Sequence, residues 1–193
     1  MENNFKTSAR IVFEIGKESI ENKIIALSEI IKNSYDAGAT KCDVIIHEEG
    51  ELINLFDRKI SSIEIVDNGI GMNDNDLSNN WLIIGTNNKK MLKEQNLQNN
   101  SVRVPVGEKG IGRFAINKIG NKVTIITKKN NESCYCLNID FNKFLDDKML
   151  EDIKMPINLY NGEKKIYTSS GTRIIIEDLN EEWNDTDLRK VYT

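Results

Sequence analysis

The stretch EIIKNSYDA, residues 29–37, places three polar side chains in a segment rich in isoleucine: Glu29, Asn33 and Asp36. At about 100° per residue, these side chains fall within an arc of roughly 60° on one helix face. A buried helical stripe is indicated by apolar residues at spacings of three and four, namely Ile20, Ile24, Leu27 and Ile31. The sequence therefore predicts a helix over residues 18–37, ended by Gly38, with a core face opposite a polar face.

The polar face of this helix has two interpretations. It could be an ordinary solvent-exposed surface. It could also be the wall of a ligand pocket, because Ile25 lies within the same arc and Ile30 lies close to it. The helix alone does not decide between them.

Outward from this helix, the pattern is that of one α/β domain spanning residues 1–193. Alternating apolar residues predict strands at 41–47, 61–67, 122–129, 133–140 and 171–179. Short helices are predicted at 77–85 and 113–120, and a new helix begins near the end of the sequence. Residues 86–106 form a long polar loop of the kind that is functional or mobile. Residues 142–169 are irregular, with a helical turn near 144–150.

Composition excludes several classes of function. The net charge of −4 argues against a generic nucleic-acid-coating surface. The sequence has neither a membrane-length apolar run nor a signal peptide, so a cytoplasmic protein is expected.

Cys134 and Cys136 would face the same side of a strand, either as half of a metal site or as small apolar fillers, and fillers are favoured. The single histidine, His47, is expected to be structural or exposed.

The segment IVDNGIGM, residues 65–72, ends a strand at Asp67 and then supplies two glycines. Glycines allow a sharp turn and a close approach of a ligand. A carboxylate at such a turn can accept a hydrogen bond from the exocyclic amine of adenine, whereas the carbonyl of guanine would repel it. Asp67 is therefore a candidate adenine selector, with Met72 as an apolar wall for the ring. The alternative is a plain turn.

A second glycine cluster, GEKGIGRF at residues 107–114, precedes the helix predicted at 113–120. Free backbone N–H groups before a helix bind phosphate, and Lys109 and Arg113 add positive charge. The cluster is not a P-loop, because Arg113 and Phe114 stand where Lys and Ser or Thr are required. It is not a dinucleotide fingerprint either, since no strand precedes it and the strand after it ends in TKKN.

Taken together, EIIKNSYDAGAT, DNGIGM, GEKGIG and SGTRIII resemble the four motifs of the GHKL ATPases, which include gyrase B, the ninety-kilodalton heat-shock chaperone, sensor histidine kinases and MutL. The resemblance covers about residues 20–180, and NSYDAGAT is most similar to the MutL and MORC branch. It implies a two-layer α/β sandwich (the Bergerat fold). The sheet would be mixed and mostly antiparallel, with helices on one face and a mobile ATP lid at about 86–110.

The resemblance also implies roles for individual residues, with ATP and Mg²⁺ as ligands. Glu29 matches the general base that activates water, and Asn33 matches the Mg²⁺ ligand. Asp36 would face the sugar and base, and Asp67 the adenine amine. The other nucleotide contacts implied are Gly71, Met72, Lys89, Gly110, Ile111, Gly112, Arg113 and Thr172.

The implied function is ATP binding with slow hydrolysis, in the N-terminal ATPase module of a larger clamp or chaperone-like machine. Glu29 favours hydrolysis over the phosphotransfer of histidine kinases, which generally lack a glutamate there. The full-length protein would form an ATP-dependent homodimer, take a catalytic lysine from a following domain and act on a DNA or protein client, for example in repair or phage defence. A non-hydrolysing interaction module and a phosphotransfer domain are the alternatives.

Overall fold

The computed structural model describes residues 4–49, 59–85, 112–162 and 169–191. The helices and strands are named in chain order, with η for a short 3₁₀ or π turn. The elements are α1 Ile11–Phe13, η1 Glu14–Glu18, α2 Lys23–Asp36, β1 Cys42–Glu49, β2 Lys59–Asp67, α3 Asp74–Asp76, η2 Leu77–Trp81, η3 Gly112–Ala115, α5 Ile116–Ile119, β3 Gly120–Lys128, β4 Cys134–Asp140, η4 Phe141–Phe144, η5 Leu150–Asp152, β5 Ile157–Leu159, β6 Gly171–Leu179 and α6 Asp185–Val191.

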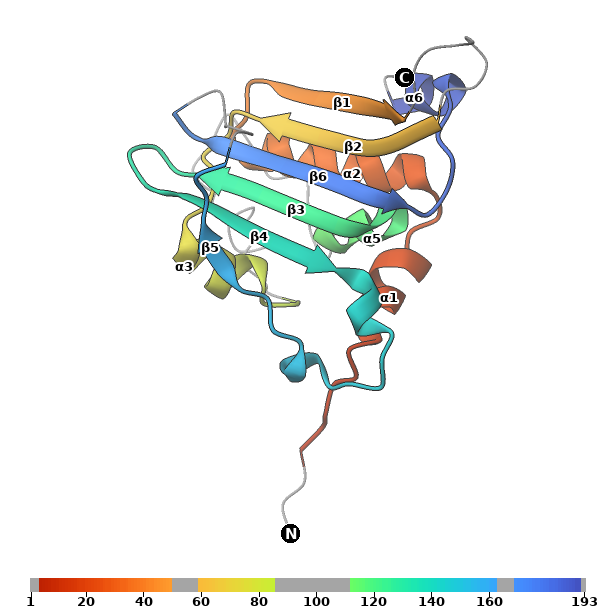
Figure 1. The fold of residues 1–193 in the computed structure, drawn as a ribbon, viewed down its shortest axis with the longest axis vertical. Coiled ribbons are helices and arrows are strands. Elements are labelled where there is room, and N and C mark those ends of the chain that lie inside the picture. The colour runs from red at the N-terminus through yellow and green to blue at the C-terminus, as the bar shows by residue number, and fades with distance from the viewer. Residues whose placement is uncertain (1–3, 50–58, 86–111, 163–168, 192–193) are drawn as a thin grey trace, which may run out of the picture.

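Six strands form one sheet in the order β1-β2-β6-β3-β4-β5 (Figure 1). All five predicted strands are present, and the short edge strand β5 lies in the region that was predicted to be irregular. The predicted two-layer α/β fold is confirmed. The expectation of a partly mixed sheet is corrected, because the strands of the described residues pair only in antiparallel fashion: β6 enters between β2 and β3 and runs opposite to both.

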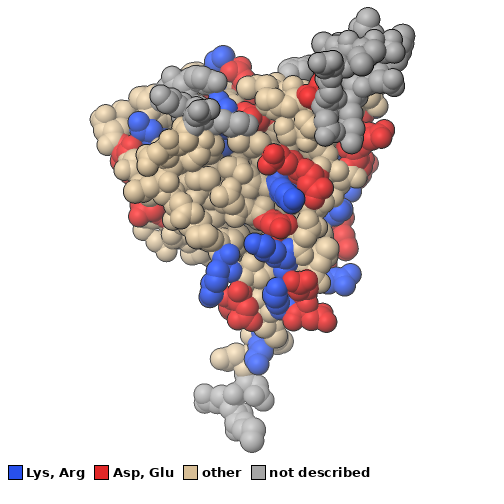
Figure 2. Space-filling view, in the orientation of Figure 1, with Lys and Arg blue, Asp and Glu red and all other residues tan. Residues whose placement is uncertain are grey.

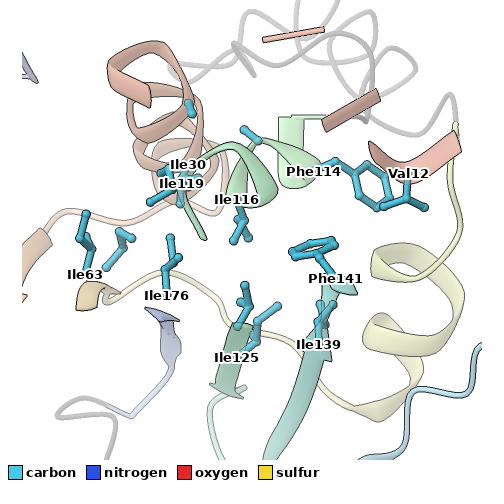
Figure 3. Close-up of a cluster of buried hydrophobic side chains, with 14 of the residues drawn as sticks. Val12, Ile30, Ile63, Phe114, Ile116, Ile119, Ile125, Ile139, Phe141 and Ile176 are labelled. Carbon is cyan, nitrogen blue, oxygen red and sulfur yellow. The ribbon is translucent and has the colours of Figure 1, made fainter. Parts of the chain in front are cut away.

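Helices α2 and α5 cover one face of the sheet and leave the other face open (Figure 1). The main core lies between these two layers. Figure 3 shows side chains from the strands, such as Ile63, Ile125 and Ile176, facing Ile30 of α2 and Ile119 of α5. All five are at most 1% exposed. Burying a side chain of this size stabilises the fold by about 1.5–3 kcal/mol, so this contact holds the two layers together.

The helix that carries the polar stripe is shorter than predicted. The side-chain oxygen of Asn22 accepts hydrogen bonds from the N–H groups of Ile24 and Ile25, at 3.0 Å each, and this cap starts α2 at Lys23. The predicted start at residue 18 is therefore wrong, and the separate turns α1 and η1 precede the helix. The predicted end is confirmed, since Gly38 follows the helix with a φ of 76°.

The buried face of α2 also differs from the predicted stripe. Its buried residues are Ala26, Leu27, Ile30 and Ser34. Ile24 and Ile31 are only partly buried, and Ile20 lies before the helix. The buried face is rotated because α2 packs against η3 and α5 as well as against the sheet. Ile30 therefore belongs to the core, whereas Ile25, at 39% exposure, remains beside the polar stripe.

The open face of the sheet carries a second, smaller apolar cluster, which consists of Ile126, Cys136 and Ile175, with Cys134 packed against it. Figure 2 views this face and shows few charged atoms over its left half. The described residues contain no group of three side chains that could hold a metal ion, and both cysteines are unpaired. Cys136 is buried within this cluster and Cys134 packs against it, which is the packing expected of small apolar side chains.

An ion-paired group lies on the same open face of β1, β2 and β6. The Glu64 carboxylate is 2% exposed and is contacted by an Arg173 guanidinium nitrogen at 3.0 Å. The other Glu64 oxygen lies 3.1 Å from Nε2 of His47, whose side chain is 43% exposed. His47 is therefore a structural partner of a buried carboxylate, as its sequence context predicts.

Helix α6 packs against the start of α2. Lys23 forms a 2.8 Å ion pair with Asp187, and its ammonium lies 5.2 Å from the ring centre of the buried Trp183. The helix predicted near the end of the sequence is thereby confirmed and anchored. A search of the described residues found no helix with the length and hydropathy needed to cross a membrane.

Candidate functional site

One row of side chains crosses the sheet on the face that the helices cover. Asp67 at the end of β2 pairs with Thr172 of β6, and Thr172 pairs with Thr127 of β3. Directly paired residues of an antiparallel sheet point to the same side. All three side chains are less than 9% exposed, so the pairing brings three polar groups together beneath α2.

The Asp67 carboxylate is held from two sides. The N–H of Gly69 donates to Oδ1 at 2.8 Å, and the hydroxyl of Ser34 on α2 donates to Oδ2 at 3.0 Å. Burial raises the pKa of this carboxyl above its usual value, and these hydrogen bonds only partly offset that effect. The backbone N–H of Thr172 is a third donor to this carboxylate. An ionised carboxylate has about four lone-pair sites, so Asp67 can still accept a further hydrogen bond from a ligand.

The turn after Asp67 requires glycine. Gly71 has a φ of 64°, and a Cβ atom there would lie 1.9 Å from the carbonyl oxygen of Lys128. The next N–H, that of Met72, donates to the Thr127 hydroxyl at 2.9 Å. The turn is therefore fixed against the end of β3, while the half-buried Met72 side chain packs against the main core.

Thr127 links this turn to β6. Its hydroxyl lies 3.0 Å from the hydroxyl of Thr172 and 3.2 Å from the carbonyl of Gly171, and the side chain is fully buried. A buried hydroxyl that holds three partners gives its neighbours fixed positions. Thr172 is therefore held beside Asp67, in the same row.

Glu29 lies at the middle of α2, on the N-terminal side of Ser34. Its Oε2 is 3.6 Å from the position that a Cβ atom would take on Gly112, the first residue of η3. Its Oε1 forms a 2.7 Å ion pair with Lys32. Ser34 lies five positions after Glu29, or about 7.5 Å along the helix axis. One extended ligand along α2 could therefore contact Asp67 with one end and lie beside Gly112 and Glu29 with the other.

Asn33 and Asp36 are half-buried on the same helix. Asn33 lies about one turn after Glu29, on the same face, and Asp36 is the last residue of α2. An amide oxygen at this position suits Mg²⁺, which takes oxygen ligands and keeps several waters.

Arg113 is turned toward η2. Its guanidinium donates to the carbonyl oxygen of Asn80 at 2.8 Å and to that of Ile83, and it lies 5.7 Å from the ring centre of Trp81. Burial lowers its pKa to about 10, so it stays charged at neutral pH. These contacts join η2 to η3. The remaining predicted contacts, Lys89, Gly110 and Ile111, lie outside the described residues.

Sequence reasoning missed three residues of this arrangement: Ser34, Thr127 and Lys32. Ser34 could have been found, because it follows Asn33 directly and falls on the buried side of α2. Thr127 could not, since its role depends on β3 lying next to β6 in the sheet.

Comparison with known proteins adds independent information. The family model described as histidine kinase-, DNA gyrase B- and HSP90-like ATPase matches residues 21–172. The chaperone protein HtpG of Campylobacter jejuni subsp. jejuni serotype O:23/36 (strain 81-176) is 27% identical over 187 residues, which cover 90% of this chain and 30% of the relative. That of Sulfurovum sp. (strain NBC37-1) is 32% identical over 130 residues, which cover 62% and 21% respectively.

The chain thus spans less than a third of the length of these two relatives. Both are named as chaperones, not as MutL or MORC proteins, so the predicted placement beside MutL and MORC stays a prediction.

Proposed function

The chain belongs to the histidine kinase-, DNA gyrase B- and HSP90-like ATPase family, and from this premise we propose that it binds MgATP along α2 and hydrolyses the terminal phosphate. One observation carries the proposal. Helix α2 contacts a buried acceptor, Asp67, through Ser34, and places a second carboxylate, Glu29, beside Gly112. This arrangement suits a ligand with an amine at one end and phosphates at the other.

Asp67 would bind the adenine. Its carboxylate accepts the exocyclic amine of adenine, and the carbonyl that guanine carries at that position would be repelled. Thr172, held by Thr127 in the same row, would complete the contact through water. Gly71 would pack near the base, and Met72 would form an apolar wall.

The phosphates would lie beside Gly112. Among the described residues, a Cβ atom on Gly112 would have a single neighbour within 4 Å beyond the adjoining chain, which is Oε2 of Glu29. The Gly112 backbone therefore lies directly beside the Glu29 carboxylate. Gly110, Ile111 and Lys89 are proposed phosphate contacts that lie outside the described residues. Arg113 would hold this end in place through its hydrogen bonds to the carbonyls of Asn80 and Ile83.

Asn33 would hold Mg²⁺ through its amide oxygen, and Asp36 would face the sugar and base. The ion, when bound, neutralises phosphate charge. A single protein oxygen fits this role, because Mg²⁺ is usually bound by one or two protein groups together with phosphate oxygens and water.

Glu29 would act as the general base. Its side chain is 33% exposed, so water can reach it, and it lies about one turn from Asn33. A positioned base contributes about 10²- to 10⁴-fold to a rate.

We further propose that this domain is the ATPase module of a larger ATP-gated machine. The relatives are named chaperones, and the chain matches less than a third of their length. An ATP-dependent homodimer acting on a protein or DNA client is the proposed setting. A nucleotide-dependent interaction module without turnover is the alternative.

A calorimetric titration with MgATP, MgADP and MgGTP tests the binding proposal, with EDTA added to remove the metal. We expect binding of both adenine nucleotides, a clear loss of affinity for GTP and weaker ATP binding in EDTA. Glu29→Gln should keep ATP affinity and lower turnover at least about 100-fold. Equal affinity for ATP and GTP would refute the adenine site, and unchanged turnover in the variant would refute the base.

A further inference from the structure

Lys32 contacts the proposed base directly. Its ammonium lies 2.7 Å from Oε1 of Glu29, one helical turn away on α2. Both side chains are partly exposed, at 47% for Lys32 and 33% for Glu29. No sequence motif pointed to Lys32, and its place beside a reactive carboxylate calls for an explanation beyond solubility.

The two oxygens of Glu29 have different surroundings. Oε1 is held by Lys32, whereas Oε2 faces Gly112 at 3.6 Å from the position of an added Cβ atom. A carboxylate bound at one oxygen can no longer rotate freely, so the other oxygen keeps its direction. We infer that Lys32 is a positioning residue, which directs Oε2 of Glu29 toward the terminal phosphate; this inference rests on the proposed function.

Charge gives Lys32 a second effect on the same contact. A carboxylate beside the terminal phosphate of ATP repels it, and a cation bound to the carboxylate offsets that repulsion. ADP has no terminal phosphate and is largely free of the effect. Arg113 does not serve this purpose in the structure, because its guanidinium faces the carbonyls of Asn80 and Ile83. Within the described residues, Lys32 is the cation in contact with Glu29.

A purely structural role for this pair would be small. Exposed ion pairs three residues apart on a helix add little to folding stability. Removing Lys32 should therefore leave the thermal unfolding curve in place, so that a functional effect can be separated from a folding defect.

The test compares Lys32→Met with wild-type protein in MgATP turnover and in the affinities for MgATP and MgADP. We expect kcat to fall about tenfold, a fraction of the loss on removing the base itself. ATP affinity should fall about fivefold, while ADP affinity changes by less than about twofold. Lys32→Arg should restore most of both. Lys41→Met is the matched control. Lys41 lies just before β1, and its ammonium forms a comparable exposed ion pair, at 2.6 Å, with the carboxylate of Asp43 on β1.

Three outcomes would overturn the inference. The first is a Lys32→Met variant with wild-type kcat and a wild-type ratio of ATP to ADP affinity. The second is an equal loss for ATP and ADP. The third is a loss of ATP affinity as large in a Glu29→Gln background as in wild type, since Lys32 would then contact phosphate itself. Failure of the proposed function has a different signature, because wild-type protein would then not bind ATP at all.

Discussion

Replacing Asp67 with asparagine should abolish ATP binding while making the ligand-free fold more stable. The carboxylate is 8% exposed, and its raised pKa shows that burial disfavours the ionised form. Asparagine is neutral and nearly the same size. Its carbonyl can still accept from the N–H of Gly69, and its amide can donate to the Ser34 hydroxyl. The pocket should therefore keep its shape, with an amide N–H₂ donor in place of the carboxylate oxygen that would accept the adenine amine.

The expected loss of affinity follows from two contributions. A hydrogen bond to a charged group is worth about 1.5–3 kcal/mol, and two donors left facing each other cost about 1–3 kcal/mol more. The sum is roughly 2.5–6 kcal/mol, which corresponds to a fall of about 10²- to 10⁴-fold in the affinity for MgATP.

The stability change should depend on pH. A carboxyl whose pKa is raised in the folded state contributes stability below its unfolded pKa, and this contribution is lost as pH rises through the folded pKa. Asp67 is such a group, and the asparagine variant has no titrating group there. The advantage of the variant should therefore be absent in acid and grow as pH rises through the pKa of the folded state.

Titration calorimetry measures the affinity, and urea unfolding in acidic and neutral buffer measures the stability. Asp43→Asn is the matched control, because Asp43 lies on the neighbouring strand with a side chain that is 46% exposed. It should change neither quantity appreciably. An Asp67→Asn variant that binds MgATP within about threefold of wild type would refute the adenine contact. A variant that is less stable at neutral pH would refute the reasoning about buried charge.

Two further predictions concern the turn that follows Asp67. Gly71→Ala should destabilise the fold by roughly 2–4 kcal/mol, because the new Cβ would lie 1.9 Å from the Lys128 carbonyl oxygen and φ is 64°. Gly112→Ala is the control, since its new Cβ would have its nearest contact at 3.6 Å, and it should unfold like wild type. Equal urea midpoints for the two variants would contradict this reasoning. Thr127→Val should lower the free energy of unfolding in urea by about 1–3 kcal/mol, because it leaves the N–H of Met72 without its acceptor. Thr127→Ser should restore the lost stability. A valine variant as stable as wild type would show that the hydroxyl is dispensable.

The strands could be predicted from sequence, whereas the limits and the buried face of α2 could not. Strand β6 was expected at 171–179 and occupies those residues, because its apolar side chains alternate between the core and the second cluster. The start of α2 depends on whether Asn22 acts as a cap, a choice that the sequence leaves open. Its buried face depends on η3 and α5, which arrive from nearly 80 positions later in the chain.

Some residues of the candidate site could likewise be predicted from the sequence, and others could not. Glu29, Asn33 and Asp67 lie in short motifs whose chemistry can be read locally. Thr127 acquires its role only through the strand order, because β6 inserts between β2 and β3 and so places Thr172 between Asp67 and Thr127. Lys32 was overlooked for a different reason, since a lysine on an exposed helix position resembles any other surface charge.

The two carboxylates of the site, Asp67 and Glu29, place opposite demands on water, and the fold meets both. Adenine recognition depends on shielding the carboxylate from bulk water, and Asp67, at 8% exposure, lies in an interior row of the sheet, where β1, β6 and α2 enclose it. Hydrolysis depends on admitting water, and Glu29, at 33% exposure, lies beside the start of η3. A carboxylate shielded like Asp67 could not receive the attacking water, and one as exposed as Glu29 would be a weak selector for adenine. This division explains why changes at Asp67 should act on affinity, whereas changes at Glu29 and Lys32 should act mainly after the nucleotide is bound.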